Sequence, residues 1–318
     1  MFIKILNNDE KFQYRTKVSP NVIFNRFDII YKGNFECLYF KHDDKEYYIQ
    51  FHINNNICEL GIYLIDLNKE IIEKIFKFIN SNYKNVYYFY LYQTLVPFNH
   101  KFTHIDWVLN LPNSFEDYLK TFSNKSRYNK KRSRKILEKD FNVEYKYYNN
   151  ETIPEEVYNA FCKYKVDKME NRSIVFENFD IFKSLITDIY TLYIDNEPVA
   201  IILYSFLEGK DCYCYNMAYN DKYKKYTIGN ILFYYSIEKL IERNITQIYL
   251  GSGNYDYKVQ SKANCLKTFR GFVKYKVPFY KQIFSYFIKD NRIYFNILGK
   301  LISHRFKDEI NSIHYWFL

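Results

Sequence analysis

The residues best suited to chemistry lie in one segment, 211–258, of a chain that is otherwise poor in glycine. Four of the chain's eight glycines fall in or beside this segment: Gly209, Gly229, Gly251 and Gly253. Lysines precede Gly229, and an apolar helical pattern follows it. Because a helix N-terminus presents unpaired amide N–H groups and partial positive charge, anions bind there. The spacing therefore predicts an anion site at which Gly229 lets a pyrophosphate approach the backbone.

The predicted anion site combines charged side chains with the backbone at the start of the helix. Its residues are Lys224, Lys225, Tyr226, Thr227, Ile228, Gly229 and Asn230. An ordinary turn between a strand and a helix is the alternative interpretation, because a single glycine before a helix is a weak signal.

A second glycine pair, Gly251 and Gly253, follows the next predicted strand. If the two strands separate there, the freed amides and carbonyls can bind an amide-rich pantetheine arm as they would bind an added strand. Tyr255 or Tyr257 would then be placed to donate a proton to a departing thiolate. The other residues expected to line the arm are Asn216, Met217, Ala218, Gly253, Asn254 and Lys258. A solvent-exposed turn with stacked tyrosines is the alternative.

The elements that position these residues repeat along the chain. In the second half, the predicted helices are 154–168, 179–188 and 230–243, and the predicted strands are 191–194, 198–206, 211–218, 247–251 and 272–277. In the first half, the predicted strands are 34–40, 47–53, 58–65 and 85–92, and the predicted helix is 67–80, capped by Asn68. Both halves give a hairpin, a third strand, a helix and a strand, repeated after about 155 residues. Only the second half has a glycine between its third strand and its helix.

A basic segment lies between the two halves. Eight of the residues in 125–139 are basic: Lys125, Arg127, Lys130, Lys131, Arg132, Arg134, Lys135 and Lys139. A helix of this kind can bind RNA or an acidic substrate, or it can be a solvated surface helix. It lacks the interleaved aromatic residues of a base-stacking platform.

The pattern predicts four parts of the chain. They are a first domain at 1–112, a basic helical connector at 113–150, a second domain at 151–279 and a C-terminal helical tail at 280–318. The tail is aromatic and basic, so it either packs on the second domain or contacts a membrane surface or a partner.

Composition limits the class of protein. Hydrophobic residues make up 48% and aromatic residues 21% of the chain, which excludes a disordered protein. The formal net charge of +10 favours anionic partners. The six cysteines form no CxxC pair, the N-terminal apolar run is too short for a signal peptide, and the longest apolar run, 199–203, is too short for a membrane span. We therefore expect a cytoplasmic protein with reduced cysteines and no transmembrane segment.

Two histidines are the candidate metal ligands. His100 and His104 are four residues apart and would share one face of a helix. No third ligand and no HExxH motif accompany them, so we predict no metal site.

The second half resembles a known enzyme fold. The order of hairpin, third strand, glycine-opened helix and splayed strand resembles the GNAT acyltransferase fold. Within it, YKKYTIGNILFYYSIEKLIERN and YLGSGNYDYK are similar to the BioF2-like, or cellulose-biosynthesis-protein-like, acetyltransferase branch, which is related to the FemABX peptidyltransferases. The matching positions are Tyr226, Gly229, Tyr257 and Lys258. The wider GNAT pattern, Q/R-x-x-G-x-G/A, has a further glycine where this chain has Thr227.

The resemblance implies an α/β (α+β) protein with two tandem GNAT-like domains, each a mixed, mainly antiparallel sheet flanked by helices. It implies that the second domain binds acetyl-CoA or another acyl-CoA, without a metal. An acceptor amine or hydroxyl would attack the thioester directly, which agrees with the lack of a G-x-S-x-G elbow in the sequence. The oxyanion would be stabilised by a backbone N–H between residues 216 and 218.

The resemblance also suggests which residues meet the acceptor. The candidates for the general base are Asp211, Asp221, Asp256 and Glu177, and those for acceptor binding are Arg127, Lys131 and Glu177. The implied acceptor is an amino sugar or another small metabolite of a cell-envelope or glycan pathway, including anionic ones such as a nucleotide-sugar.

Two other functions remain open from the sequence. One is a FemABX-like transferase that depends on aminoacyl-tRNA, in which the basic helix would bind RNA. The other is a GNAT-like pair that serves as a binding module without catalysis.

Overall fold

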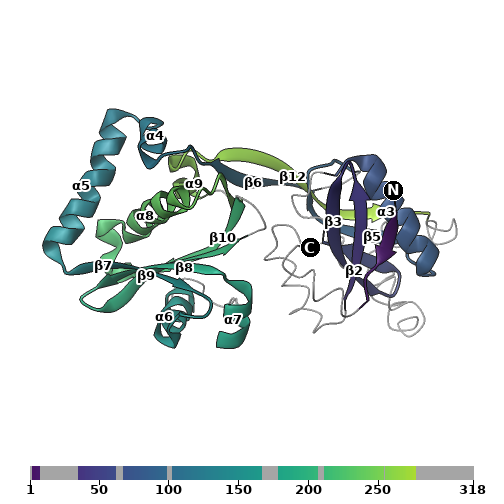
Figure 1. Cartoon of the computed structure of the whole chain (residues 1–318), viewed down its shortest axis with the longest axis horizontal. Coiled ribbons are helices and arrows are strands. Elements are labelled where there is room, and N and C mark those ends of the chain that lie inside the picture. Colours follow the sequence, from purple (N-terminus) through teal and green to yellow (C-terminus); the bar gives the residue numbers. More distant parts are fainter. Residues whose placement is uncertain are drawn as a thin grey trace, which may run out of the picture. The chain divides into compact units, whose positions relative to one another are not determined.

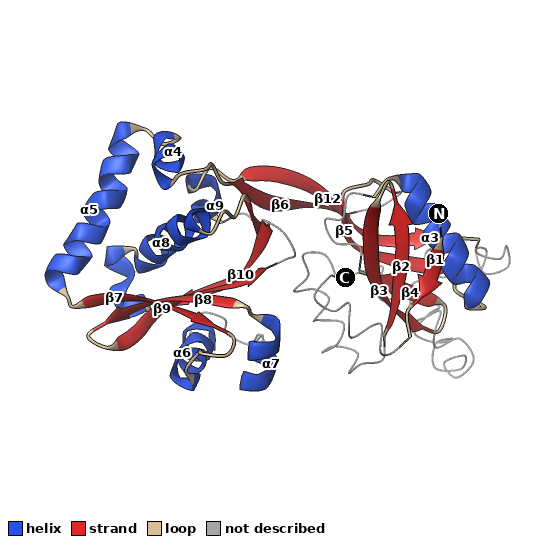
Figure 2. Cartoon of the chain, viewed as in Figure 1, coloured by secondary structure: helices blue, strands red, loops and turns tan. Residues whose placement is uncertain are grey.

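The computed structural model describes residues 2–7, 35–61, 67–98, 102–166, 178–206, 211–253 and 255–276. The chain forms two compact units. Among the described residues, unit 1 comprises 2–7, 35–61, 67–98, 102–103 and 268–276, and unit 2 comprises 104–166, 178–206, 211–253 and 255–267. Each unit contains a mixed sheet, flanked by one described helix in unit 1 and by several in unit 2 (Figures 1 and 2). The predicted α/β fold class with two sheet-based units is therefore confirmed.

Unit 1 is a sheet covered by one described helix. Its elements are β1 (Ile3–Ile5), β2 (Glu36–His42), β3 (Lys45–Asn54), β4 (Ile57–Leu60), α3 (Lys69–Asn82), β5 (Tyr88–Thr94) and β12 (Asn264–Lys274). The strands lie in the order β1-β2-β3-β4-β5-β12, and all neighbours are antiparallel except β4 and β5. The Asn68 side chain accepts from the N–H of Ile71 at 2.9 Å, so the predicted helix cap is confirmed.

Unit 2 contains the same strand arrangement with more helices. Its elements are β6 (Phe102–Asn110), α4 (Phe115–Lys120), α5 (Asn124–Asp140), β7 (Val143–Asn149), α6 (Glu155–Val166), α7 (Phe179–Leu185), β8 (Asp188–Ile194), β9 (Glu197–Phe206), β10 (Asp211–Tyr219), the 3-10 helix η1 (Asp221–Tyr226), α8 (Ile228–Glu242), β11 (Gln247–Ser252) and α9 (Asp256–Gln260). The strands lie in the order β7-β8-β9-β10-β11-β6, and all neighbours are antiparallel except β10 and β11.

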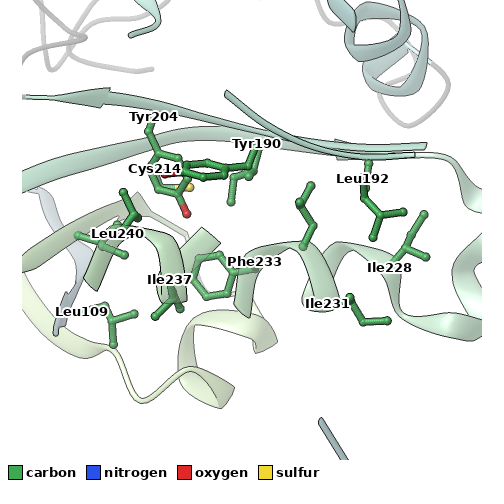
Figure 3. Close-up of a cluster of buried hydrophobic side chains, with 14 of the residues drawn as sticks. Leu109, Tyr190, Leu192, Tyr204, Cys214, Ile228, Ile231, Phe233, Ile237 and Leu240 are labelled. Atoms are coloured by element: carbon green, nitrogen blue, oxygen red, sulfur yellow. The ribbon is translucent and has the colours of Figure 1, made fainter. Parts of the chain in front are cut away.

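The sheet of unit 2 is covered on both faces, which explains the continuous apolar run of β9. Residues 199–204 are all buried, as expected for a strand with a core on each side. Alternate residues of β9 enter the two cores: Ile202 packs with α8, and Ile201 packs with α6 and α7. Figure 3 shows the first core, where Tyr190, Tyr204 and Cys214 of the strands face α8.

The two units exchange their sixth strands. β6 follows β5 in the chain but pairs with β11, from residue 110 opposite residue 247 to residue 106 opposite residue 252. β12 follows β11 and α9 but pairs with β5. Each unit therefore needs a strand from the other half of the sequence to complete its sheet.

Several sequence-based expectations need correction. The predicted connector, 113–150, is part of unit 2, because Tyr118, Phe122 and Leu137 are buried in the same core as α8. The strands β6 and β7 and the helix α9 were not predicted. His104 belongs to β6, so a helical pair with His100 is wrong for that residue, and His100 lies outside the described residues.

The predicted boundary of the second domain at residue 279 also changes. The last strand, predicted at 272–277 as part of that domain, is β12 at 264–274 and belongs mostly to unit 1. The predicted tail, 280–318, lies outside the described residues. In the described part of the chain, no helix has the length and apolar character needed to cross a membrane.

Candidate active site

The two central strands of unit 2 separate after a short parallel pairing. β10 pairs with β11 only through residues 211–213 and 247–249. Beyond that point β10 continues along β9, and β11 continues along β6. The predicted separation of the strands is therefore confirmed. We call the opening between residues 214–219 of β10 and 250–252 of β11 the fork. In unit 1, by contrast, β5 pairs with β4 over the whole length of β4.

A β-bulge on each strand sets the point at which the fork opens. The register between β10 and β9 shifts between Cys214 and Asn216, and the register between β11 and β6 shifts between Tyr249 and Gly251. A bulge bends its strand and increases the local twist. Because both bulges come directly after the last β10–β11 pair, they turn the two strands apart.

Glycine is required at two positions on the β11 side of the fork. Gly251 has a φ of +67° and Gly253 a φ of +96°, which favour a residue without a side chain. A Cβ on Gly251 would lie 2.7 Å from Tyr213 Oη, and a Cβ on Gly253 would lie 2.9 Å from the ring of Tyr255. The two glycines therefore permit a backbone path that other residues would strain.

The amide of Met217 points into the fork. Its N–H donates to the side chain of Asn216, with 2.9 Å between the nitrogen and Oδ1. The N–H of Asn220 faces β9, where it donates to Val199 O at 2.8 Å. Because backbone groups alternate in direction along a strand, the N–H of residue 217 is directed away from β9. Among the predicted oxyanion donors, the Met217 amide thus has the suitable direction, whereas the amide of the fully buried Ala218 faces β9.

Lys258 is buried beside the β11 end of the fork, with 1% of its surface exposed. Its Nζ donates to Gly251 O at 2.9 Å, which ties α9 to the glycine with the left-handed backbone. Burial lowers the pKa of Lys258 to about 8, although Cys214 and Asp106 act in the opposite direction. This contact gives Lys258 a positioning role, and its predicted contact with a cofactor stays a prediction.

Of the two predicted proton donors, Tyr257 is the more enclosed. Its ring meets Phe233 of α8 edge-on, with 5.4 Å between centroids. Burial raises the pKa of Tyr257 well above its usual value, so the phenol keeps its proton at neutral pH. Its hydroxyl has no hydrogen-bond partner among the residues that the structure describes. Tyr255 stacks on Tyr257 at 6.2 Å and is 60% exposed.

The helix α8 begins at a residue with an unusual backbone conformation. Thr227, the N-cap, has a φ of 56° and a ψ of 40°, the left-handed region in which glycine is favoured. Thr227 occupies the position where the wider GNAT pattern has its further glycine, and it keeps the conformation that a glycine would adopt. Its side chain makes no capping hydrogen bond, so the first amides of α8 are left to another acceptor.

Gly229 packs closely against β10, and its predicted role beside a pyrophosphate stays a prediction. It lies inside the first turn of α8 and not before the helix. A Cβ at this position would lie 3.0 Å from Cδ1 of Tyr219 and 3.6 Å from Sδ of Met217. A larger residue would require the ring of Tyr219 to move by a few tenths of an ångström, so glycine favours the close packing of α8 on β10.

The other residues of the predicted anion site differ in their access to a ligand. Lys224 and Lys225 of η1 are exposed. Tyr226 donates to Asp140 Oδ2 at 2.9 Å, which links η1 to the last turn of α5. Ile228 is fully buried, so only its backbone can meet a ligand, whereas Asn230 is half-buried.

A cavity of about 510 Å³ lies between α4, α5 and α8. We call it the α5–α8 cavity. It brings together Thr227 and Asn230, which were predicted to bind the cofactor, and Lys131, which was predicted to bind the acceptor. Lys130 and Tyr234 also line it. The basic run contained Lys130, but nothing in the sequence distinguished it from its neighbours, because the burial of one lysine depends on α8.

The predicted general bases do not gather at the fork. Asp211 lies at the closed end of the fork, about 20 Å along β10 from Met217 at ~3.3 Å per residue. It accepts a hydrogen bond from Thr246 at 3.4 Å, and burial raises its pKa. Asp221 and Asp256 are exposed. None of these positions identifies the base, so each stays a prediction.

The remaining predicted residues are placed less favourably. Arg127 donates to Asn124 of its own helix and does not line the α5–α8 cavity. Glu177 and Asn254 lie outside the described residues. Within the described ranges, no group of three or more His, Cys, Asp or Glu side chains is arranged to hold a metal ion.

A family model agrees with the site in unit 2. Residues 124–259, which belong to unit 2, match the family model described as acetyltransferase (GNAT) domain. The match contains both strands of the fork and all of α8. No curated protein sequence matches the chain.

Several solved structures share the fold over most of the chain. FemX is 9% identical, with a TM-score of 0.61, over 87% of this chain and 98% of that one. L-PGS from Bacillus licheniformis is 14% identical, with a TM-score of 0.57, over 86% of this chain and 93% of that one. The C-terminal domain (DUF2156) of a putative lysylphosphatidylglycerol synthetase from Agrobacterium fabrum is 12% identical, with a TM-score of 0.54, over 71% of this chain and 80% of that one. These likenesses extend to the fold alone, and they leave the BioF2-like branch untested.

Proposed function

We propose that unit 2 transfers an acyl group from acyl-CoA to an amine or hydroxyl of a small acceptor. The observation that carries the proposal is the fork, at which β10 and β11 pair for three residues and then separate. An extended, amide-containing chain fits such an opening because it can pair with a free strand edge. The start of α8 lies beyond the end of β10, and its uncapped amides are suited to the pyrophosphate of the same donor.

The acceptor would attack the thioester directly, and no acyl-enzyme would form. The lone pair of the acceptor nitrogen or oxygen attacks the thioester carbonyl carbon, and the carbon–sulfur bond breaks as the intermediate collapses. The Met217 N–H, now held by Asn216, would stabilise the oxyanion. The departing thiolate would take its proton from Tyr257, and the proton of the acceptor would leave to a base that is not yet identified.

The finer parts of the proposal rest on the resemblance. Acetyl-CoA is the expected donor, and an amino sugar or another small metabolite of a cell-envelope or glycan pathway is the expected acceptor. The replacement of a loop glycine by Thr227 does not argue for a non-catalytic module, because Thr227 keeps the left-handed conformation.

Binding of phosphate-free S-acetyl-pantetheine tests the fork directly. Met217→Pro removes the N–H that faces the fork and leaves the β9-facing amides in place, and Met217→Ala is the control that keeps the N–H. We expect Met217→Pro to weaken binding by up to about tenfold, the value of one ordinary hydrogen bond to the bound ligand. If neither S-acetyl-pantetheine nor millimolar acetyl-CoA raises the melting temperature of the wild-type protein, the proposal is wrong.

An aminoacyl-tRNA-dependent transfer is the second candidate. Two observations favour it: the fold is shared with FemX over most of both chains, and α5 carries a row of cationic side chains. Purified protein that carries RNA, judged by its absorbance ratio, and that ignores acetyl-CoA would support this candidate over the first.

A further inference from the structure

The α5–α8 cavity has the size of a ligand site and an unequal charge distribution. Its volume of about 510 Å³ falls within the usual range for small-molecule pockets. The α5 wall contributes four cationic residues, Lys125, Lys130, Lys131 and Arg134, and the α8 wall contributes one acidic residue, Glu238. Figure 1 shows α5 and α8 on the same side of the sheet of unit 2.

Most of this positive charge is uncompensated. Arg134 is paired, since its Nε donates to Glu138 Oε1 at 2.7 Å. The three lysines of the wall form no ion pair with any carboxylate in the described part of the chain. An anion that entered the cavity would therefore meet cations that are not already neutralised.

Lys130 is the cation that the fold holds most firmly. It is half-buried, and its Nζ lies 3.7 Å from the ring centroid of Tyr234 and 4.4 Å from that of Phe122. It donates to the Tyr234 hydroxyl. An ammonium has three donors, so this contact leaves two for a ligand. Burial, together with the nearby charge of Lys262, lowers the pKa of Lys130 to about 8.

We propose that the α5–α8 cavity binds the phosphate group of a small organic phosphate and that Lys130 is its principal cation. A bound dianion would supply the counter-charge that no carboxylate among the described residues provides for Lys130. The side chains of Ser126, Asn129 and Asn230 line the same cavity and can donate to the remaining phosphate oxygens. The walls also contain Tyr234 and Tyr235, which suit the organic part of the ligand.

This inference deepens the proposed function and rests on it, because the phosphate would belong either to the nucleotide of the acyl donor or to a phosphorylated acceptor. Both sources would present a phosphate group to Lys130, but they predict different effects of a Lys130 substitution on coenzyme A binding. In both cases, the cavity adds a binding site on α5, a helix that precedes the first strand of the repeated unit.

The test compares one lysine in the cavity with one outside it. Lys130→Met removes the proposed cation, and Lys135→Met removes an exposed cation of the same helix that does not line the cavity. Calorimetric titration gives the dissociation constants of coenzyme A, 3′-dephospho-coenzyme A and inorganic pyrophosphate. We expect Lys130→Met to weaken binding of a phosphate probe about tenfold, and Lys135→Met to weaken it less than about twofold.

The pattern among probes identifies the source of the phosphate. If the donor supplies it, Lys130→Met weakens coenzyme A and removes the preference for coenzyme A over the dephospho form. If the acceptor supplies it, Lys130→Met leaves coenzyme A unchanged and weakens pyrophosphate binding in the presence of saturating acetyl-CoA. Either pattern supports the inference.

If Lys130→Met binds all three probes as tightly as the wild-type protein does, the inference is overturned. The same conclusion holds if Lys130→Met weakens binding of tRNA, measured in parallel, and of none of the three probes. Lys131→Met provides a second variant at an exposed lining position, where we expect a loss of about threefold, in case Lys130→Met does not fold. S-acetyl-pantetheine carries no phosphate, so it reports on the fork alone. If neither S-acetyl-pantetheine nor acetyl-CoA binds while pyrophosphate binding still depends on Lys130, the proposed function is wrong and the cavity assignment stands.

Discussion

Replacing Gly251 with alanine tests how the fork is held open. Gly251 has a φ of +67°, and a Cβ there would lie 2.7 Å from Tyr213 Oη. The left-handed backbone costs an alanine about 1–2 kcal/mol. Displacing the Tyr213 ring by the added methyl costs roughly 1–3 kcal/mol more. We therefore expect Gly251→Ala to lower the free energy of unfolding by about 2–5 kcal/mol.

The substitution Tyr213→Phe separates these two contributions, because it removes the oxygen that the new methyl would meet. The Gly251→Ala/Tyr213→Phe double variant should keep only the backbone cost, so it should be about 1–2 kcal/mol less stable than Tyr213→Phe alone. Urea unfolding followed by circular dichroism gives the four free energies. Purely additive effects of the two substitutions would show that the close contact does not exist.

The same four proteins also test the link from this contact to binding. A shift of Gly251 would move the carbonyl that accepts from Lys258 and would change the opening of the fork. S-acetyl-pantetheine should therefore bind more weakly to Gly251→Ala than to the wild-type protein. Binding should recover in part in the double variant. Equal affinity in all four proteins would refute a role of Gly251 in shaping the fork.

Three further predictions concern single residues. Tyr257→Phe should slow acyl transfer more than it weakens acetyl-CoA binding, and an unchanged rate would make Tyr255 the next candidate. The pKa of Lys258 is lowered from 10.5 to about 8, so between these values the unfolded chain binds more protons, and the free energy of unfolding should rise with pH. The free energy of unfolding of the Lys258→Met variant should rise less over the same pH range. Urea unfolding at a series of pH values measures both slopes. Arg243→Met removes the ion pair with Asp188, which is 4% exposed and keeps a hydrogen bond from the Tyr147 hydroxyl at 2.6 Å. The substitution should lower the free energy of unfolding by about 1–3 kcal/mol, and Arg243→Lys should lower it less.

The repeated order of elements was predictable because local patterns encode it. Five apolar residues of α3 recur at helical spacing and are buried, whereas Phe78 is partly buried: the five are Ile71, Ile72, Ile75, Phe76 and Ile79. The continuous apolar run of β9 indicated a strand with a core on both faces, which the structure has. Signals of this kind depend on residues within one element, so no partner needs to be known.

The exchange of β6 and β12 was not predictable, because strand pairing depends on residues in two elements that are far apart in the sequence. In β6 (FTHIDWVLN), Ile105 is exposed and Asp106 is fully buried, so the alternation of polar and apolar residues does not indicate the buried face. Its partner β11 lies more than a hundred residues later in the chain, as the pairing of Asn110 with Gln247 shows. Strand neighbours that are distant in sequence leave no periodicity, and only the packed structure determines which sheet each sixth strand completes.

The glycines of the site have different structural environments, although the sequence shows them as one cluster. The glycine cluster indicated a special backbone, and Gly251 and Gly253 do have one, whereas Gly229 has a helical backbone and packs against the ring of Tyr219. The residue with the left-handed backbone at the start of α8 is Thr227, which composition alone would never select. A Thr227→Gly variant therefore tests whether the backbone conformation or the side chain of residue 227 determines anion binding at the start of α8. It should keep the loop conformation and leave binding of acetyl-CoA unchanged, whereas a large gain in affinity would mean that the threonine side chain, and not the backbone, limits the anion site.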